Sequence, residues 1–160
     1  MLALVLLPFA RSNASVTAAK RTTEPGCEIL DYGLYVPQTQ RTRYADPGSV
    51  TGERFEISDV RFTKRTTSIA STLGQRFGIR YRLKNLVPSS VVVTWRVAYP
   101  SPVRRSKGWE HSFRAAPAGG ELVQHLLYDF TIASEIVAGT WDFQVLVDGR
   151  AACSFAFTVK

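Results

Sequence analysis

Residues 138–159, at the C-terminal end of the chain, constrain the fold more than any other stretch. Two runs in which hydrophobic and polar residues alternate flank the pair Asp148-Gly149. An Asp-Gly pair tolerates the positive φ angles of a two-residue type I′ turn, so the pattern predicts a closing β-hairpin with one buried face. The residues expected on that face are Trp141, Phe143, Val145 and Val147 before the turn, and Cys153, Phe155, Phe157 and Val159 after it.

The upstream sequence has a similar pattern. Alternating stretches lie between turns rich in Pro, Gly, Asn and Ser, and none keeps a helical period. The predicted strands cover residues 27–36, with Leu30 and Tyr32 facing inward, and residues 55–65, 77–84, 91–99, 109–115 and 122–131. Residues 100–108 are expected to form a loop, and 132–138 can hold one helical turn. With the hairpin this makes about eight strands, a pattern typical of two antiparallel sheets with their apolar faces together.

The N-terminal segment has the composition of an export signal. Residues 2–10 form an apolar run too short to span a bilayer, and small residues follow in the spacing that signal peptidase reads. We interpret residues 1–19 as a signal peptide, 20–26 as a linker and 27–160 as a single domain, exported to the bacterial periplasm or beyond. No Lys or Arg precedes the apolar run. The alternatives are a truncated or misassigned start, a mobile apolar N-terminus or a buried first strand.

The chain is basic. Its 160 residues include 20 Lys and Arg against 13 Asp and Glu, which gives a formal net charge of +7. This charge favours anionic partners such as phospholipid headgroups, lipopolysaccharide, polyanionic glycans or acidic proteins. Plain solubility is the alternative interpretation, because basic exported proteins are common.

The cations are predicted to gather on one sheet face. In 77–84 they alternate with apolar residues, and another points outward from 91–99, so the cations share a face if these two strands pair. Guanidinium groups bind carboxylate and phosphate bidentately, which makes the face a candidate anion-binding site. Its residues are Arg80, Arg82, Lys84, Arg96, Arg104 and Arg105. In the alternative interpretation they only cover the sheet and deter edge pairing. No aromatic residue is interleaved with them, so no nucleic-acid partner is expected.

The only two cysteines, Cys27 and Cys153, lie near opposite ends of the expected domain. In an oxidising compartment such an isolated pair is most simply a disulfide. A copper site of the cupredoxin kind needs His, and usually Met, shortly after the ligand Cys, and none follows Cys153. We therefore expect a disulfide and neither a metal nor a cofactor.

Short aromatic and glycine motifs occur in a particular order along the chain. They are Asp31-Tyr32-Gly33-x-Tyr35, Gly74-x-x-Phe77-Gly78-x-x-Tyr81, Tyr99-Pro100, Tyr128-x-Phe130, Glu135-Ile136-Val137-x-Gly139-x-Trp141-x-Phe143 and Phe157-x-Val159. In this order they resemble an uncharacterised bacterial family, number 3859 among the domains of unknown function, although Tyr99-Pro100 stands where His-Pro is expected. The resemblance implies an all-β protein, a single immunoglobulin-like antiparallel β-sandwich of about eight strands. It implies no activity and carries over no functional residue.

The search for catalytic residues is mostly negative. His111 shares the inward phase of its strand, and His125 falls on the outward, solvent-facing phase. The sequence contains no Gly-x-Ser-x-Gly elbow, no phosphate-binding glycine loop and no zinc-ligand spacing. A hydrolase remains an alternative only if one of these histidines lines a pocket. The aromatic residues Tyr32, Tyr81, Trp95, Trp109, Tyr128 and Trp141 could form a carbohydrate platform, but their inward phase favours a role in the core.

Three functions are compatible with this sequence. The favoured hypothesis is a non-catalytic binding or structural module of the cell envelope, with an anionic envelope component or a periplasmic protein as partner. The second is an inhibitor or chaperone-like module that presents a loop or an edge strand. The third is a periplasmic hydrolase of unknown type. No membrane-spanning segment is expected in the mature chain.

Overall fold

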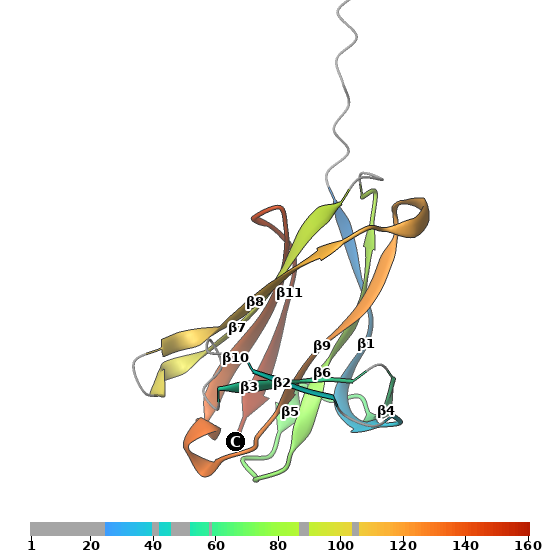
Figure 1. Cartoon of the computed structure of the whole chain (residues 1–160). Coiled ribbons are helices and arrows are strands. Elements are labelled where there is room, and N and C mark those ends of the chain that lie inside the picture. Colours follow the sequence, from blue (N-terminus) through green and yellow to red (C-terminus); the bar gives the residue numbers. More distant parts are fainter. Residues whose placement is uncertain (1–24, 40–41, 46–51, 58, 87–89, 104–105) are drawn as a thin grey trace, which may run out of the picture.

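Antiparallel strands make up most of the residues that the structure, a computed structural model, describes; these are 25–39, 42–45, 52–57, 59–86, 90–103 and 106–160 (Figure 1). The expected signal peptide, residues 1–19, lies outside them, and so does most of the expected linker. The described residues also include two short 3-10 turns, η1 (Ala118–Gly120) and η2 (Ala133–Glu135). No helix among the described residues is long and apolar enough to cross a membrane.

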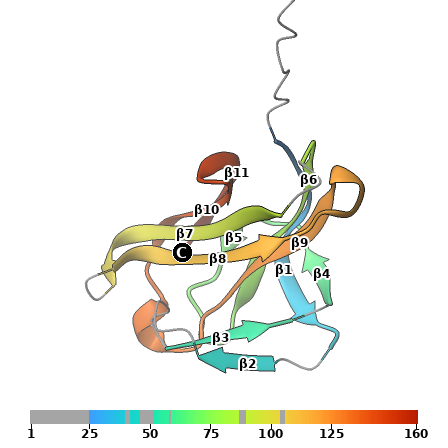
Figure 2. The same ribbon diagram turned by 45° about the horizontal axis from the view of Figure 1, so that its top comes forward.

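Two sheets face each other, and a separate ribbon lies beside them (Figures 1 and 2). The four-stranded sheet has the order β4 (Val60–Lys64), β1 (Gly26–Pro37), β6 (Arg76–Lys84) and β9 (Leu122–Asp129). The five-stranded sheet has the order β5 (Ser68–Ile69), β11 (Arg150–Val159), β10 (Gly139–Val147), β7 (Val91–Val103) and β8 (Ser106–Ala115). The ribbon pairs β2 (Thr42–Ala45) with β3 (Glu53–Glu56). The expected antiparallel sandwich is confirmed, although β5 pairs with β11 in parallel and there are more strands than the predicted eight or so.

The closing hairpin forms as its alternation predicts. Strands β10 and β11 pair from Gly139 to Val147, with Trp141 opposite Phe157 and one register shift between Val145 and Leu146. Asp148 and Gly149 have φ angles of 48° and 78°, the positive values that a type I′ turn requires. Trp141 and Phe157 are fully buried. The hairpin therefore supplies two neighbouring strands of the five-stranded sheet and a large part of the core.

The core lies between the two sheets and takes one side of each long strand. In β6 the large hydrophobic residues are buried and alternate, from Ile79 onward, with Arg80, Arg82 and Lys84 on the outer face, which is the pattern of a strand with one solvent face. Phe77 of this strand packs its ring against rings from β10 and β11, with centroid distances of 5.5 Å to Phe143 and 5.2 Å to Phe157. Full burial of one such side chain typically contributes ~1.5–3 kcal/mol. The contacts between these rings hold the two sheets together.

Three local predictions are wrong. A register shift between Ile29 and Asp31 in β1 brings Ile29, rather than Leu30, into contact with the core together with Tyr32. The single strand expected over 55–65 is two strands, because β3 ends at Glu56 and β4 begins at Val60. The loop expected over 100–108 is largely strand. Its prolines cannot donate to a ladder, and the register shifts there, but Val103 still pairs with Ser106 and extends the β7–β8 hairpin.

Candidate binding surface

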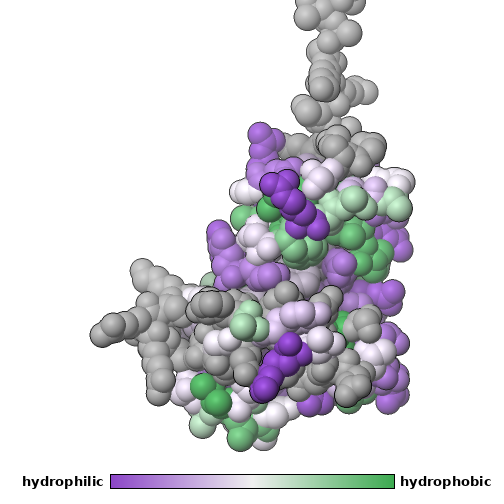
Figure 3. Space-filling view, viewed as in Figure 1, coloured by the Kyte–Doolittle hydropathy of each residue, from purple (hydrophilic) through white to green (hydrophobic). Residues whose placement is uncertain are grey.

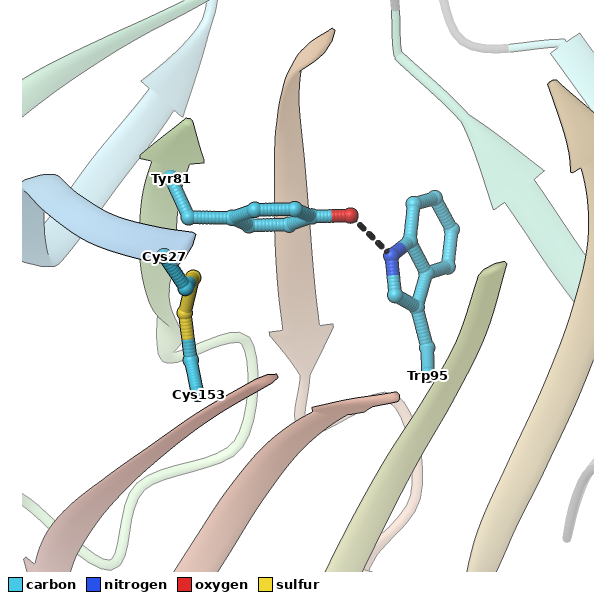
Figure 4. Close-up of a disulfide and its surroundings, with 4 residues drawn as sticks. All are labelled: Cys27, Tyr81, Trp95 and Cys153. Atoms are coloured by element: carbon cyan, nitrogen blue, oxygen red, sulfur yellow. Dashed lines mark hydrogen bonds between the residues drawn. A yellow bond between two sulfur atoms is a disulfide. The ribbon is translucent and has the colours of Figure 1, made fainter. Parts of the chain in front are cut away.

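The predicted disulfide is present and joins the two sheets. Cys27 in β1 and Cys153 in β11 are bonded, with their Cα atoms 5.7 Å apart (Figure 4). Beside the disulfide, Trp95 Nε1 donates a hydrogen bond of 2.6 Å to the Tyr81 hydroxyl, again from one sheet to the other. Burial raises the pKa of that hydroxyl above its usual range, so it stays protonated. These four residues link the two sheets of the sandwich.

The six predicted anion-binding residues do not form one face. Strand β6, which carries Arg80, Arg82 and Lys84, belongs to the four-stranded sheet, whereas Arg96 lies on β7 in the five-stranded sheet. The prediction failed because the chain crosses from one sheet to the other between these consecutive strands. Arg104 and Arg105 lie outside the described residues. On the face shown in Figure 3, the hydrophilic side chains of the described residues are spread over the molecule rather than gathered in one area.

Carboxylates also neutralise most of these cations. Lys84 Nζ lies 2.6 Å from Glu28 Oε2, and Arg96 Nε lies 2.9 Å from Glu110 Oε2. The hydrogen bond from Lys84 lowers the pKa of Glu28, an exposed carboxyl.

Arg82 lies 3.6 Å from Glu28 and 3.8 Å from Glu121. Arg80 differs from these residues. It is exposed and makes no ion pair within the part of the chain that the structure describes.

The two histidines lie in different sheets. His111, on β8, is half-buried, and its ring stacks against Trp109 at 6.0 Å and Phe113 at 6.2 Å. His125, on β9, faces outward opposite Arg80, as its phase predicts, but it is half-buried rather than fully in solvent. The pKa of His125 is lowered, mainly by burial and to a smaller extent by the charge of Arg80. The charge of Asp59 raises it and opposes both effects. Among the described residues, no three His, Cys, Asp or Glu side chains are arranged to hold a metal ion.

The aromatic residues considered as a carbohydrate platform pack in the core or against it. Tyr81 and Trp141 are fully buried, and Tyr32, Trp95, Trp109 and Tyr128 are half-buried against the core cluster. Tyr32 packs on Phe155 across the sheets, with 4.8 Å between the ring centroids. A platform for a sugar needs exposed ring faces in a row, so this arrangement supports the core interpretation.

The motif Glu135-Ile136-Val137-x-Gly139-x-Trp141 is explained by the fold. Glu135 is buried, and its Oε2 accepts hydrogen bonds from the amides of Thr131 and Ile132, which fixes the turn η2. Trp141 Nε1 donates to the carbonyl oxygen of Val137 at 2.8 Å. Gly139 has a φ of 128°, and a Cβ there would lie 2.6 Å from Cγ of Pro100. The motif therefore determines how β9 connects to β10.

The four edge strands of the two sheets are protected to different degrees. Strand β5 has only two residues, β4 carries Arg61 and Lys64, and β8 carries Glu110 and Arg114. Shortness and charge are devices that prevent an edge from pairing with another chain. Strand β9 has eight residues and carries no Lys, Arg, Glu or Pro, and its one carboxylate, Asp129, stands at its last position and pairs with Arg76. Its Val123 is one of the few large hydrophobic side chains in the described residues that is exposed, at 39%.

Three residues of β9 direct their backbone groups away from β6. Phe130 N donates to Gln75 O, and the register continues without a shift from Arg76 opposite Asp129 to Leu83 opposite Leu122. Residues of an antiparallel ladder alternate between bonded and non-bonded pairs, so the N–H and C=O groups of Val123, His125 and Leu127 point to the free edge. They make no backbone hydrogen bond to other described residues.

The edge of β9 is accessible along part of its length. The first half of the strand, next to η1, runs along the side of the molecule, away from β2 and β3 (Figures 1 and 2). The sequence analysis did not predict that β9 lies at an edge, because an edge position depends on which strands are neighbours in the sheet. The signal available was the lack of Lys, Arg and Pro between residues 122 and 129.

Comparisons with known proteins support the fold. The sequence model of a family described as "Domain of unknown function (DUF3859)" matches residues 23–159. No curated protein matches the chain. A crystal structure of an immunoglobulin-like protein from Pseudomonas aeruginosa has a TM-score of 0.57 and 21% sequence identity, and the match covers 88% of this chain and 99% of that chain. The expected immunoglobulin-like fold is therefore confirmed.

Two further solved structures match only part of the sandwich. The alkylpurine DNA glycosylase of Pseudomonas fluorescens has a TM-score of 0.45 and 19% sequence identity, and the match covers 59% of this chain and 28% of the glycosylase chain. A β-glucosidase from Listeria innocua has a TM-score of 0.42 and 14% sequence identity, and the match covers 61% of this chain and 15% of the glucosidase chain. At these TM-scores neither protein bears on the function of this chain.

Proposed function

We propose that this chain, which belongs to the DUF3859 family of domains of unknown function, is a non-catalytic exported module of the bacterial cell envelope that binds another protein by strand addition to β9. The observation that supports this function is the combination of an unpaired backbone edge and unprotected side chains on β9. Strand addition supplies main-chain hydrogen bonds for affinity and alternate side chains for specificity.

Two observations support a non-catalytic role. The histidines His111 and His125 lie in different sheets, and each is explained by its own surroundings: stacked aromatic rings for the first, and Arg80 and Asp59 for the second. Among the described residues, the contacts of Glu135 and Gly139 in the family motif fix the backbone between β9 and β10. A hydrolase needs a nucleophile or base that converges with other groups on one substrate position.

Export is supported by the disulfide between Cys27 and Cys153, because such bonds persist in oxidising compartments. Cleavage by signal peptidase after Ala14, Ala18 or Ala19 is expected. Mass spectrometry of the N-terminus of the protein made in its native host tests this. An intact Met1 in a cytoplasmic fraction contradicts it.

A pair of substitutions at one position tests the binding site. Val123→Pro removes an N–H that points to the free edge and leaves the ladder to β6 intact, so it blocks strand addition without removing a hydrogen bond of the fold. Val123→Thr keeps the N–H and the strand propensity. Both variants are expected to melt close to the wild type.

The readout is capture of periplasmic proteins by the tagged full chain made in its native host. We expect the wild type and Val123→Thr to retain the same partner and Val123→Pro to lose it. Equal retention by all three proteins contradicts binding at β9.

A further inference from the structure

A strand that pairs with β9 extends the four-stranded sheet by one strand, and its side chains alternate between the two faces of that sheet. On the outer face they stand beside Val123, His125 and Leu127. On the inner face they stand beside Leu122, Gln124 and Leu126. The chemistry of each face of β9 therefore indicates which residues the added strand carries.

One cation on the outer face beside β9 makes no ion pair among the described residues. Four cations line this face of β6, and three of them have carboxylate partners: Arg76 with Asp129 at 3.3 Å, Lys84 with Glu28, and Arg82 with Glu28 and Glu121. Arg80 has no such partner among the described residues, because Asp31, which lies opposite it in β1, pairs with Arg65 at 2.9 Å. On its other side Arg80 lies opposite His125 of β9.

The imidazole of His125 adds no charge at neutral pH. Burial and the neighbouring Arg80 both lower its pKa, and Asp59 opposes them with a smaller effect. A carboxylate on the added strand next to His125 lies two strand spacings from Arg80, about 9.5 Å between backbones, which two long side chains can bridge.

The inner face favours hydrophobic residues. Leu126 is fully buried, and Leu122 packs against the core cluster. A side chain added beside them enters the margin of the core, where a charge without a partner is costly.

We propose that the occupant of the β9 edge is an extended segment of a partner protein in which hydrophobic residues alternate with carboxylates, the carboxylates facing Arg80. This inference rests on the proposed function and names the partner of the same edge. A second copy of this chain fits less well. Antiparallel pairing of two β9 strands centred on His125 places Glu121 of one copy opposite Asp129 of the other, and like charges directly opposite are destabilising.

Synthetic peptides of about nine residues, blocked at both ends, test the inference on the full chain. One alternates Val with Glu, one Val with Gln and one Val with Lys, and affinities are measured by fluorescence anisotropy. We expect the Glu peptide to bind at least about tenfold more tightly than the Lys peptide, since complementary charge sets partner choice. Arg80→Gln should reduce this ratio to about threefold or less.

Two control variants separate the edge from the charge. Arg61→Gln removes an exposed cation from β4, at the opposite edge of the same sheet, and should keep the full preference. Val123→Pro should abolish binding of all three peptides.

The outcomes distinguish the two proposals. Edge-dependent binding with no preference for Glu overturns this inference and leaves the proposed function standing. Peptide binding that Val123→Pro does not affect overturns both. A dimer of the free protein that dissociates in Val123→Pro identifies a second copy as the occupant and overturns the partner inference.

Discussion

Trp95 and Tyr81 connect the two sheets through the interior of the sandwich. The indole Nε1 of Trp95, on β7, donates a hydrogen bond of 2.6 Å to the hydroxyl oxygen of Tyr81, on β6. Tyr81 is fully buried, so its hydroxyl has no access to water as a substitute partner. A buried polar group that loses its partner costs ~1–3 kcal/mol.

Trp95→Phe should therefore lower the free energy of unfolding by more than the loss of ring volume alone would. The double variant Trp95→Phe/Tyr81→Phe removes both polar groups and should be more stable than the sum of the two single changes indicates, by a coupling of ~0.5–3 kcal/mol. Urea unfolding of the four proteins measures this coupling. Strict additivity contradicts the hydrogen bond.

Gly139 should tolerate no side chain. Its φ of 128° disfavours an L-residue, and a Cβ there meets the ring of Pro100 at 2.6 Å. Gly149 is the matched control, because it also has a positive φ, 78°, but open space around it. Gly149→Ala should cost ~1–2 kcal/mol for the backbone conformation alone. Gly139→Ala should cost a further ~1–3 kcal/mol for the overpacking, and equal melting temperatures for the two variants contradict this contact.

The disulfide should contribute substantially to stability because it closes a long stretch of chain. Cys27 and Cys153 are 126 residues apart in the sequence. Loss of a native disulfide from a small exported domain typically costs ~2–5 kcal/mol. The variant Cys27→Ala/Cys153→Ala should melt well below the wild type, and reductant should destabilise only the wild type. Two thiols that react in denatured, non-reduced wild-type protein show instead that the bond does not form in solution.

The sequence was sufficient to predict the local structure of most strands. Alternation of hydrophobic residues identified β6, β10 and β11, and the isolated pair Cys27 and Cys153 was predicted to be bonded. Alternation failed at the register shift between Ile29 and Asp31, where one extra residue reverses the phase of β1.

Neighbour relations between strands could not be predicted in the same way. Consecutive strands often pair, which made β6 and β7 the expected neighbours of the anion-binding face. The chain instead crosses to the other sheet after Lys84, so Arg96 lies in a different sheet from Arg80, Arg82 and Lys84. The free edge of β9 follows from this arrangement too. Alternation shows which face of a strand is buried, but it does not show which strand lies beside it.

The surroundings of His125 predict how the stability of the domain depends on pH. Burial and Arg80 hold the pKa of this imidazole below 6.5, its ordinary value, which the unfolded chain retains. Below pH 6.5 the unfolded chain therefore binds a proton that the folded chain does not. This contribution to stability is present above that pH and is lost as the pH falls through the lowered pKa of the folded state.

His125→Gln removes this contribution, so its melting temperature should fall less than that of the wild type between about pH 7.5 and pH 5. Arg80→Gln removes the second cause of the shift and should raise the pKa of His125, measured by NMR titration, towards 6.5. Burial, the larger cause, stays in place, so part of the shift should remain in Arg80→Gln. An unshifted pKa in the wild type shows that His125 is solvated, and the β9 edge beside it is then more open than its packing indicates.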